Sequence, residues 1–154
     1  YAPHHIIGGA SPEACNKVTE FYQMLSMCIS KQFFTMTPQE ASFVKYAINS
    51  YLGMKVTFFN QLHDAALDFS CSPQRIINAV SADKRIGYSH TRVPGFDGKK
   101  GFGGACLPKD MNAFVKFNQD LTLIAESVKI NNKMREEYEL DEREKNNNIK
   151  FEDK

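Results

Sequence analysis

The fold depends most on residues 37–69, TPQEASFVKYAINSYLGMKVTFFNQLHDAALDF. Thr37 opens this stretch, a proline comes second, and Glu40 stands three residues after the threonine. Threonine and glutamate at this spacing form a capping box, and proline is favoured at the first helical position. The next such signal is Ser72-Pro73. The pattern therefore predicts one long helix, residues 38–69.

Apolar side chains recur every three or four residues along this predicted helix. They are Ala47, Tyr51, Met54, Phe58, Leu62 and Ala65. This spacing places them on one face and favours burial against another long helix. Because no other predicted helix of the chain is as long, the stripe predicts a homodimer formed through the helix 38–69.

The chain before the long helix is typical of a piece of an α/β domain. His4–Ile7 is expected to form a short strand that ends at Gly8-Gly9. Ser11-Pro12-Glu13 carries a helix cap, a proline and an acid in the first turn, so a helix should follow to about Met27. Gln32-Phe33-Phe34 is expected to be a short connector, which could be extended.

After the long helix, the sequence predicts shorter helices and one long loop. Ser72-Pro73 begins a short helix, and Pro108 begins another after residues 83–104, an irregular stretch rich in Gly, Lys and Arg. Residues 120–143 predict a further helix, and the polar tail 145–154 is expected to fray. The fold class is therefore mainly α, preceded by a strand–helix remnant.

The composition excludes several classes of function. A length of 154 residues fits one domain, or one domain and a piece of another, and a net charge of +1 gives no support to nucleic-acid binding. The 4 cysteines contain no CxxC pair and have no histidines at ligand spacing, so neither a disulfide scaffold nor a metal site is expected and a reducing, cytoplasmic setting is favoured. No apolar run approaches the ~20 residues that span a bilayer, so no membrane association is expected. The absence of an initiator methionine suggests a fragment.

The run GFGGACLPKD, residues 101–110, places a cysteine between a glycine-rich loop and a helix start. Pro108 is expected to be the first residue of that helix. Cys106 would then precede the helix N-terminus, where unpaired N–H groups favour a thiolate. We therefore predict that Cys106 is a nucleophile. No activating context surrounds Cys15, Cys28 or Cys71.

Three other residues could act with such a thiol. Lys45 and Asn49 share one side of the long helix, and Gly53 would allow close packing one turn later. An ammonium and an amide there could stabilise an oxyanion or orient a water, but a surface lysine and a structural asparagine fit the spacing equally. Asp110, four residues after Cys106, could orient a base or hold a lysine, or it could be a first-turn acid stabilised by the helix dipole.

The basic residues of the long loop give a weaker signal. A lone arginine such as Arg85 is more often solvated than bound to a ligand. Lys99 and Lys100 stand between glycines and could meet a phosphate, but glycine–lysine loops are common.

Four segments resemble the UDP-glucose/GDP-mannose dehydrogenase family, over roughly residues 4–135. Residues 101–110 resemble its active-site signature, and residues 42–52, SFVKYAINSYL, resemble its central helix with a catalytic lysine and asparagine. Residues 83–87, DKRIG, are similar to the segment whose arginine contacts the sugar in the neighbouring subunit. Residues 5–9 are similar to the last strand of its nucleotide-binding domain.

The resemblance implies an NAD-dependent oxidation of UDP-glucose to UDP-glucuronate, in two hydride transfers through a cysteine thioester. It implies that Cys106 is the nucleophile and that Asp110 helps to activate water. Lys45 and Asn49 would stabilise the oxyanion and contact the substrate. Further substrate contacts would come from Arg85, Phe102 and Gly103, and a cofactor contact from Lys109. GDP-mannose or a UDP-hexosamine is the alternative substrate.

The family also implies a domain plan. Residues 1–30 would be the end of an NAD-binding Rossmann domain. Residues 31–144 would be a central dimerisation and catalytic domain, like the C-terminal domain of 6-phosphogluconate dehydrogenase, and residues 145–154 a polar tail. Because the chain has no GxGxxG run, most of the NAD-binding domain is expected to be absent and the isolated chain incomplete for turnover.

Two other classes of function stay open. The first is a non-catalytic dimerisation module derived from the same fold. An upstream Rossmann fingerprint would favour the enzyme instead. The second is a cysteine hydrolase or acyltransferase without NAD, which needs a histidine base, His63 or His90, beside Cys106.

Overall fold

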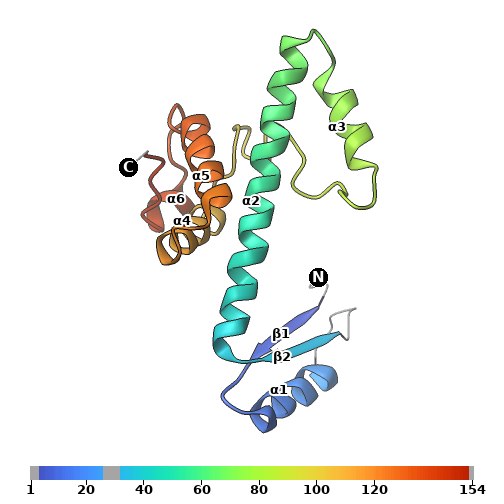
Figure 1. Ribbon diagram of the computed structural model, residues 1–154, viewed down its shortest axis with the longest axis vertical. Coiled ribbons are helices and arrows are strands. Elements are labelled where there is room, and N and C mark those ends of the chain that lie inside the picture. Colours follow the sequence, from blue (N-terminus) through green and yellow to red (C-terminus); the bar gives the residue numbers. More distant parts are fainter. Residues whose placement is uncertain (1–3, 26–31, 153–154) are drawn as a thin grey trace. The chain divides into compact units, whose positions relative to one another are not determined.

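The computed structural model describes residues 4–25 and 32–152. The chain is mainly helical and divides into two compact units, one before and one after the junction of Ala47 and Ile48 (Figure 1). The helix α2 (Pro38–Asp68) belongs to both units. No helix in the two described ranges is long and apolar enough to cross a membrane.

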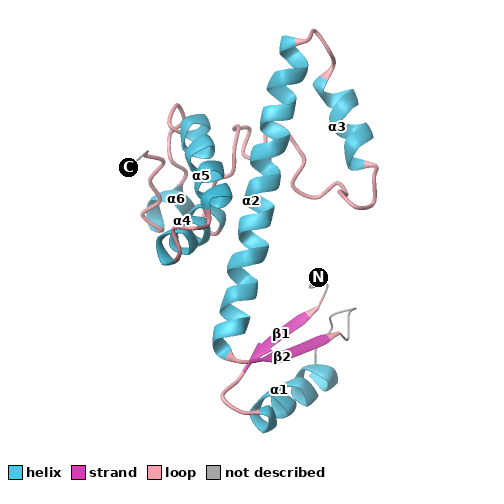
Figure 2. Ribbon diagram, in the orientation of Figure 1, coloured by secondary structure: helices cyan, strands magenta, loops and turns pink. Residues whose placement is uncertain are grey.

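The amino-terminal unit contains a strand–helix–strand motif (Figure 2). Strand β1 (His5–Gly8) is followed by α1 (Pro12–Leu25) and by β2 (Phe33–Met36). The two strands pair in parallel, from His5 opposite Phe33 to Gly8 opposite Met36. A crossover helix joins parallel strands in this way because the end of the first strand and the start of the second lie at opposite edges of the sheet.

The strand–helix prediction for this unit is confirmed, with two differences. The first strand begins and ends one residue later than predicted. The expected connector at residues 32–34 is instead mostly the second strand, since its aromatic residues pair with β1. The predicted helix end at Met27 and the residue Cys28 lie outside the described residues.

The capping box at the start of α2 is confirmed. The backbone N–H of Thr37 donates to Glu40 Oε2 at 2.8 Å, and the backbone N–H of Glu40 donates to Thr37 Oγ1 at 3.2 Å. The helix ends one residue before the predicted Phe69, and Ser70 follows with φ of 55°. The next helix, α3 (Pro73–Ser81), begins at the predicted proline.

The carboxy-terminal unit packs around α2 with two hydrophobic clusters. Phe59, Ile77 and Val93 form the first, between α2, α3 and the long loop. Phe102, Met111 and Val128 form the second, which joins α2 to α4 (Leu107–Phe117) and α5 (Thr122–Arg135). A β-carbon at residue 53 would overlap Met111 Sδ, so the close approach predicted at Gly53 is confirmed.

The end of the chain differs from the sequence prediction. The helix expected over residues 120–143 ends at Arg135, and a short helix, α6 (Glu142–Asn146), follows. Asp141 accounts for the break because its side chain caps α6.

The tail expected to fray is instead packed as far as it is described. Ile149 and Phe151 are 6% and 9% exposed. The ring of Phe151 lies 5.4 Å from the Arg135 guanidinium, and Asn132 Nδ2 donates to the backbone carbonyl of Glu152 at 3.1 Å. The domain boundaries at residues 30 and 144 stay predictions.

Candidate active site

Cys106 is the N-cap residue of α4, and its side chain is exposed. The helix begins at Leu107, so Pro108 is its second residue rather than the first as predicted. The Cys106 carbonyl accepts from the backbone N–H of Asp110 at 2.9 Å, which closes the first helical turn. The thiol is therefore accessible to a reactant while its backbone is fixed by a helix.

Asp110 lies one turn after the thiol and is buried, with its side chain 2% exposed. Asn49 Nδ2 on α2 donates to Asp110 Oδ2 at 2.6 Å. Lys109 Nζ lies 3.2 Å from the other carboxylate oxygen, Oδ1. A buried carboxylate is costly unless it is hydrogen-bonded and paired, and these two partners provide both interactions. The structure thus brings together Asn49 and Asp110, which sequence analysis selected for separate reasons.

The glycine-rich loop before Cys106 is held by asparagine side chains. Asn60 Oδ1 accepts from the backbone N–H of Gly101 at 3.1 Å. Asn131 bonds both backbone groups of Phe102, accepting from its N–H at 2.6 Å and donating to its carbonyl at 3.0 Å. The ring of Phe102 is buried in the second cluster. Substrate contact by Phe102 and Gly103 stays a prediction.

Lys45 belongs to the amino-terminal unit, one helical turn before Asn49 in the sequence of α2. Its Nζ lies 5.7 Å from the centre of the Tyr46 ring. The role implied for Lys45 stays a prediction that rests on the sequence.

Arg85 is 89% exposed and pairs with Asp83, at 2.7 Å between Nη2 and Oδ2. This hydrogen bonding raises the pKa of Arg85 and lowers the pKa of Asp83. Lys55 on α2 fixes the same turn by donating to the backbone carbonyls of Ile86 at 2.7 Å and Gly87 at 3.1 Å. Nothing in the sequence distinguished Lys55. The sugar contact of Arg85 stays a prediction.

The basic residues of the loop have partners within the chain. Lys99 Nζ donates to the backbone carbonyl of Glu139 and lies 5.9 Å from the centre of the Tyr138 ring. Lys100 Nζ pairs with Asp64 Oδ1. Both ammonium groups are thus committed to folding contacts, and phosphate binding by them stays a prediction.

Neither candidate histidine is bonded to Cys106 in the hydrogen bonds of the described ranges. His63 Nδ1 lies 3.0 Å from Asp64 Oδ1, and His90 Nδ1 lies 3.1 Å from Ser89 Oγ. Burial and the nearby charge of Lys55 lower the pKa of His90. These contacts give no support to a cysteine hydrolase. Residues 4–25 and 32–152 also hold no group of three or more His, Cys, Asp or Glu side chains arranged to bind a metal ion.

Residues 39–134 match the model of the UDP-glucose/GDP-mannose dehydrogenase family, central domain. The chain belongs to this family. Cys106, Asn49 and Asp110 all lie within the matched range, in agreement with the resemblance of the motifs.

Individual relatives agree with the family match. The chain is 32% identical over 129 residues to a UDP-glucose 6-dehydrogenase of Rhizobium meliloti, covering 81% of the chain and 28% of the relative. It is 28% identical over 114 residues to a GDP-mannose 6-dehydrogenase of Pseudomonas aeruginosa, covering 73% of the chain and 24% of the relative. A solved structure of a UDP-glucose dehydrogenase from Pyrobaculum islandicum matches with a TM-score of 0.69 and 31% identity, over 85% of this chain and 29% of that chain. The chain therefore spans less than a third of these relatives.

The turn between β1 and α1 differs from the turn of a dinucleotide-binding site. Such sites use a G-x-G-x-x-G turn between a strand and a helix, where the missing side chains leave room for a pyrophosphate. Between β1 and α1, a β-carbon at Gly8 would lie 2.8 Å from Ala41 Cβ, and one at Gly9 would lie 2.6 Å from Cys15 Sγ. These two glycines allow close packing within the unit and leave no space for a pyrophosphate. The cofactor contact of Lys109 stays a prediction.

Four residues that hold the site were missed by sequence analysis: Asn60, Asn131, Arg135 and Glu144. The last two form a buried ion pair beside the glycine-rich loop. The spacing of Asp141 and Glu144 is that of a capping box, and this signal could have located the start of α6 and its glutamate.

Proposed function

We propose that this chain supplies the cysteine nucleophile and the carboxylate–amide pair of an NAD-dependent sugar-nucleotide 6-dehydrogenase that converts UDP-glucose to UDP-glucuronate. The observation that carries the proposal is the exposed Cys106 thiol one helical turn before the buried Asp110, which Asn49 holds. The relatives' names support the substrate and the reaction class.

Removal of the two hydrides is the chemistry that NAD supplies when it is bound. The residues of this chain act between and after these transfers. Cys106 Sγ attacks the aldehyde carbon, so a C–S bond forms and the carbonyl oxygen becomes an oxyanion. After the second oxidation the product is a thioester. Water adds to its carbonyl carbon, the C–S bond breaks, and the thiol and a carboxylate are released.

Asp110 and Asn49 have complementary parts in thioester hydrolysis. Asp110 accepts a proton from the attacking water, and the Asn49 amide fixes the carboxylate that does so. Lys45 is assigned to the developing oxyanion on the sequence resemblance, since a cation stabilises negative charge that appears in the transition state.

A panel assay tests this function. The gene product that contains these 154 residues is mixed with NAD and with UDP-glucose, GDP-mannose or a UDP-hexosamine in turn, and NADH absorbance is followed. We expect the highest kcat/KM with UDP-glucose. NADH formation with another member of the panel alone would correct the substrate, and none with any of them would favour the non-catalytic dimerisation module.

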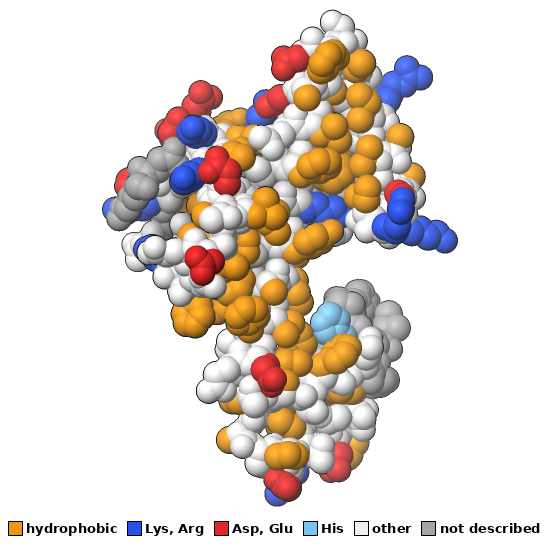
Figure 3. Space-filling view, viewed as in Figure 1, with side chains coloured by type: hydrophobic (Ala, Val, Ile, Leu, Met, Phe, Trp, Pro, Cys, Tyr) orange, Lys and Arg blue, Asp and Glu red, His pale blue; other side chains and the backbone are white. Residues whose placement is uncertain are grey.

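We also propose that the chain forms a homodimer through α2. Met54 and Leu62 of the apolar stripe pack against the chain's own clusters, but Tyr51 and Phe58 are 58% and 54% exposed, so the chain leaves part of this face uncovered. These two side chains border a pocket of about 450 Å³, to which Leu123 and Ile130 of α5 also contribute. Hydrophobic side chains gather over the carboxy-terminal part of α2 and over α3 in Figure 3. Exposed apolar area of this kind is typical of an interface.

Sedimentation of a Phe58→Asp variant tests the dimer. The unmodified chain is expected to sediment as a dimer and the variant as a monomer, because a carboxylate would be buried in an apolar contact. Phe117→Asp is the matched control, since Phe117 is 81% exposed on α4, away from the stripe. A monomeric unmodified chain, or equal dissociation by the two variants, would contradict the proposal.

A further inference from the structure

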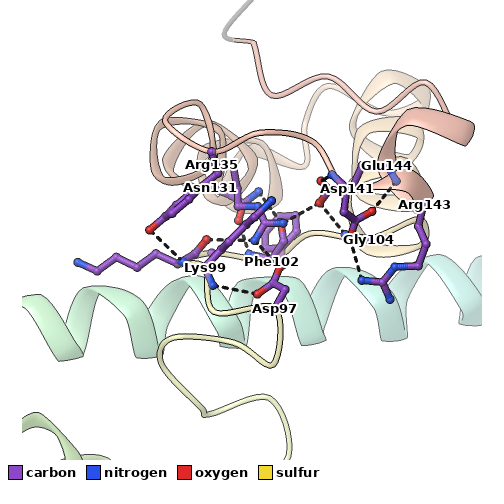
Figure 4. A network of polar contacts seen from close by, with 12 residues as sticks. Asp97, Lys99, Phe102, Gly104, Asn131, Arg135, Asp141, Arg143 and Glu144 are labelled. Carbon is purple, nitrogen blue, oxygen red and sulfur yellow. Dashed lines mark hydrogen bonds and ion pairs between the residues drawn. The ribbon is translucent and has the colours of Figure 1, made fainter.

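A buried ion pair lies beside the loop that leads to Cys106. Arg135 Nη2 is 2.6 Å from Glu144 Oε1, and each side chain is 1% exposed (Figure 4). Both residues lie beyond residue 134, where the family match ends. A buried ion pair is weak evidence for stability, so its position in the fold needs another explanation.

The ion pair is bonded to the loop on both sides of its glycine-rich centre. On the amino-terminal side of this centre, Arg135 Nη1 donates to Asp97 Oδ2 at 2.8 Å and to the backbone carbonyl of Lys100 at 3.4 Å. On the carboxy-terminal side, Glu144 Oε1 accepts from the backbone N–H of Gly104 at 2.9 Å. The pair therefore connects the two ends of residues 100–104.

The loop backbone lies directly against this pair. A β-carbon at Gly103 would overlap Arg135 Nη2 and Glu144 Oε1. Gly104 has φ of 75°, a left-handed conformation that favours glycine, and its N–H points to the Glu144 carboxylate. Glycines at these positions let the ion pair fix the backbone itself.

The carboxylate is itself fixed at the start of α6. Glu144 Oε2 accepts from the backbone N–H of Asp141 at 2.9 Å, and Asp141 Oδ1 accepts from the backbone N–H of Glu144 at 2.9 Å. Burial raises the pKa of Glu144, but hydrogen bonds from the Asp141 and Gly104 amides and from Arg135 outweigh it and lower the pKa. Glu144 is therefore a charged acceptor at neutral pH, and both of its carboxylate oxygens are hydrogen-bonded.

Cys106 lies between two residues that are hydrogen-bonded to distant parts of the chain, one through its backbone and one through its side chain. Gly104, two residues before it, is bonded to Glu144, and Asp110, four residues after it, is bonded to Asn49. We propose that Arg135 and Glu144 are positioning residues that set the direction from which the Cys106 thiol meets the aldehyde. This inference rests on the proposed function and adds to it a part of the chain outside the family match.

A Glu144→Gln variant of the gene product tests the inference. Glutamine keeps the size and an acceptor oxygen but weakens the bond to Arg135. The first oxidation should proceed at the normal rate at saturating UDP-glucose, and the thioester-forming step should slow by roughly 10–100-fold, as expected when a reacting group is misplaced by about 1 Å. Aldehyde trapped with hydroxylamine should increase accordingly. Glu142→Gln, the same change at an exposed position of α6, is the control and should change neither step.

A second measurement needs no turnover. Iodoacetamide alkylates the exposed Cys106 and Cys71, and their ratio within one molecule is read by mass spectrometry. Glu144→Gln should change the Cys106/Cys71 ratio several-fold and speed amide exchange at residues 101–104, and Glu142→Gln should change neither. If the gene product oxidises no sugar nucleotide, the proposed function fails while this measurement still tests the positioning.

Three results would overturn the inference: equal slowing of both oxidations, normal rates of both, or an unchanged alkylation ratio with unchanged amide exchange. If Glu144→Gln does not fold, Asp97→Asn takes its place. It weakens the link from Arg135 to a partly exposed carboxylate, which also accepts from the backbone N–H of Lys99, and it should shift the same ratio in the same direction.

Discussion

A Cys106→Ser variant of the gene product should retain the first oxidation of UDP-glucose and lose the second. A serine hydroxyl at this position is a far weaker nucleophile than a thiol, so attack on the aldehyde should slow by about 10³-fold or more. Aldehyde should accumulate, and the yield of NADH per sugar nucleotide should fall to half. Stopped-flow absorbance and hydroxylamine trapping measure the two effects.

The matched control for this variant is Cys71→Ser. Cys71 is also exposed, but it follows the end of α2, where its thiol contacts the backbone carbonyl of Phe69. Its replacement should leave both oxidations unchanged. A Cys106→Ser enzyme that completes the second oxidation at the normal rate would remove the thioester from the mechanism.

An Arg135→Met variant should lower the free energy of unfolding by roughly 3–5 kcal/mol, because it leaves the buried Glu144 carboxylate without its ionic partner. Urea unfolding followed by circular dichroism measures the change. Lys129→Met on the same helix removes an exposed ammonium, 3.7 Å from Glu126, and should change stability by no more than about 0.5 kcal/mol.

A double variant distinguishes the charge effect from lost packing. Arg135→Met combined with Glu144→Leu removes both charges and should recover part of the loss. Recovery should be incomplete, since the Gly104 N–H would then lack its carboxylate acceptor. A double variant no more stable than the single one would contradict the assignment of the loss to the unpaired carboxylate.

The sequence predicted those parts of the fold that local signals determine. The capping box at Thr37 and the proline after Ser72 give the limits of α2 within one residue, because caps act through neighbouring backbone groups. The second strand was missed, since its pairing with β1 is a contact between distant residues. The predicted helix over residues 120–143 was too long, because residues 136–141, EEYELD, contain no glycine or proline to indicate a break.

The same distinction between local signals and contacts of distant residues applies to the candidate site. Cys106, Asn49 and Asp110 could be selected because each has a suggestive neighbour in the sequence, and the structure joins the last two by a 2.6 Å hydrogen bond. Arg135 and Glu144 could not, because charged residues in a polar stretch are usually exposed and only the tertiary fold reveals a buried partner.

The missing side chain at Gly53 determines where α4 lies along the length of α2. Met111 occupies the space that a side chain at residue 53 would take, and it is completely buried. If α4 were shifted by one turn along α2, the Met111 thioether would leave the space beside Gly53, and a void would remain in a close-packed core. This contact therefore determines where the start of α4, and with it the Cys106 thiol, lies along the long helix.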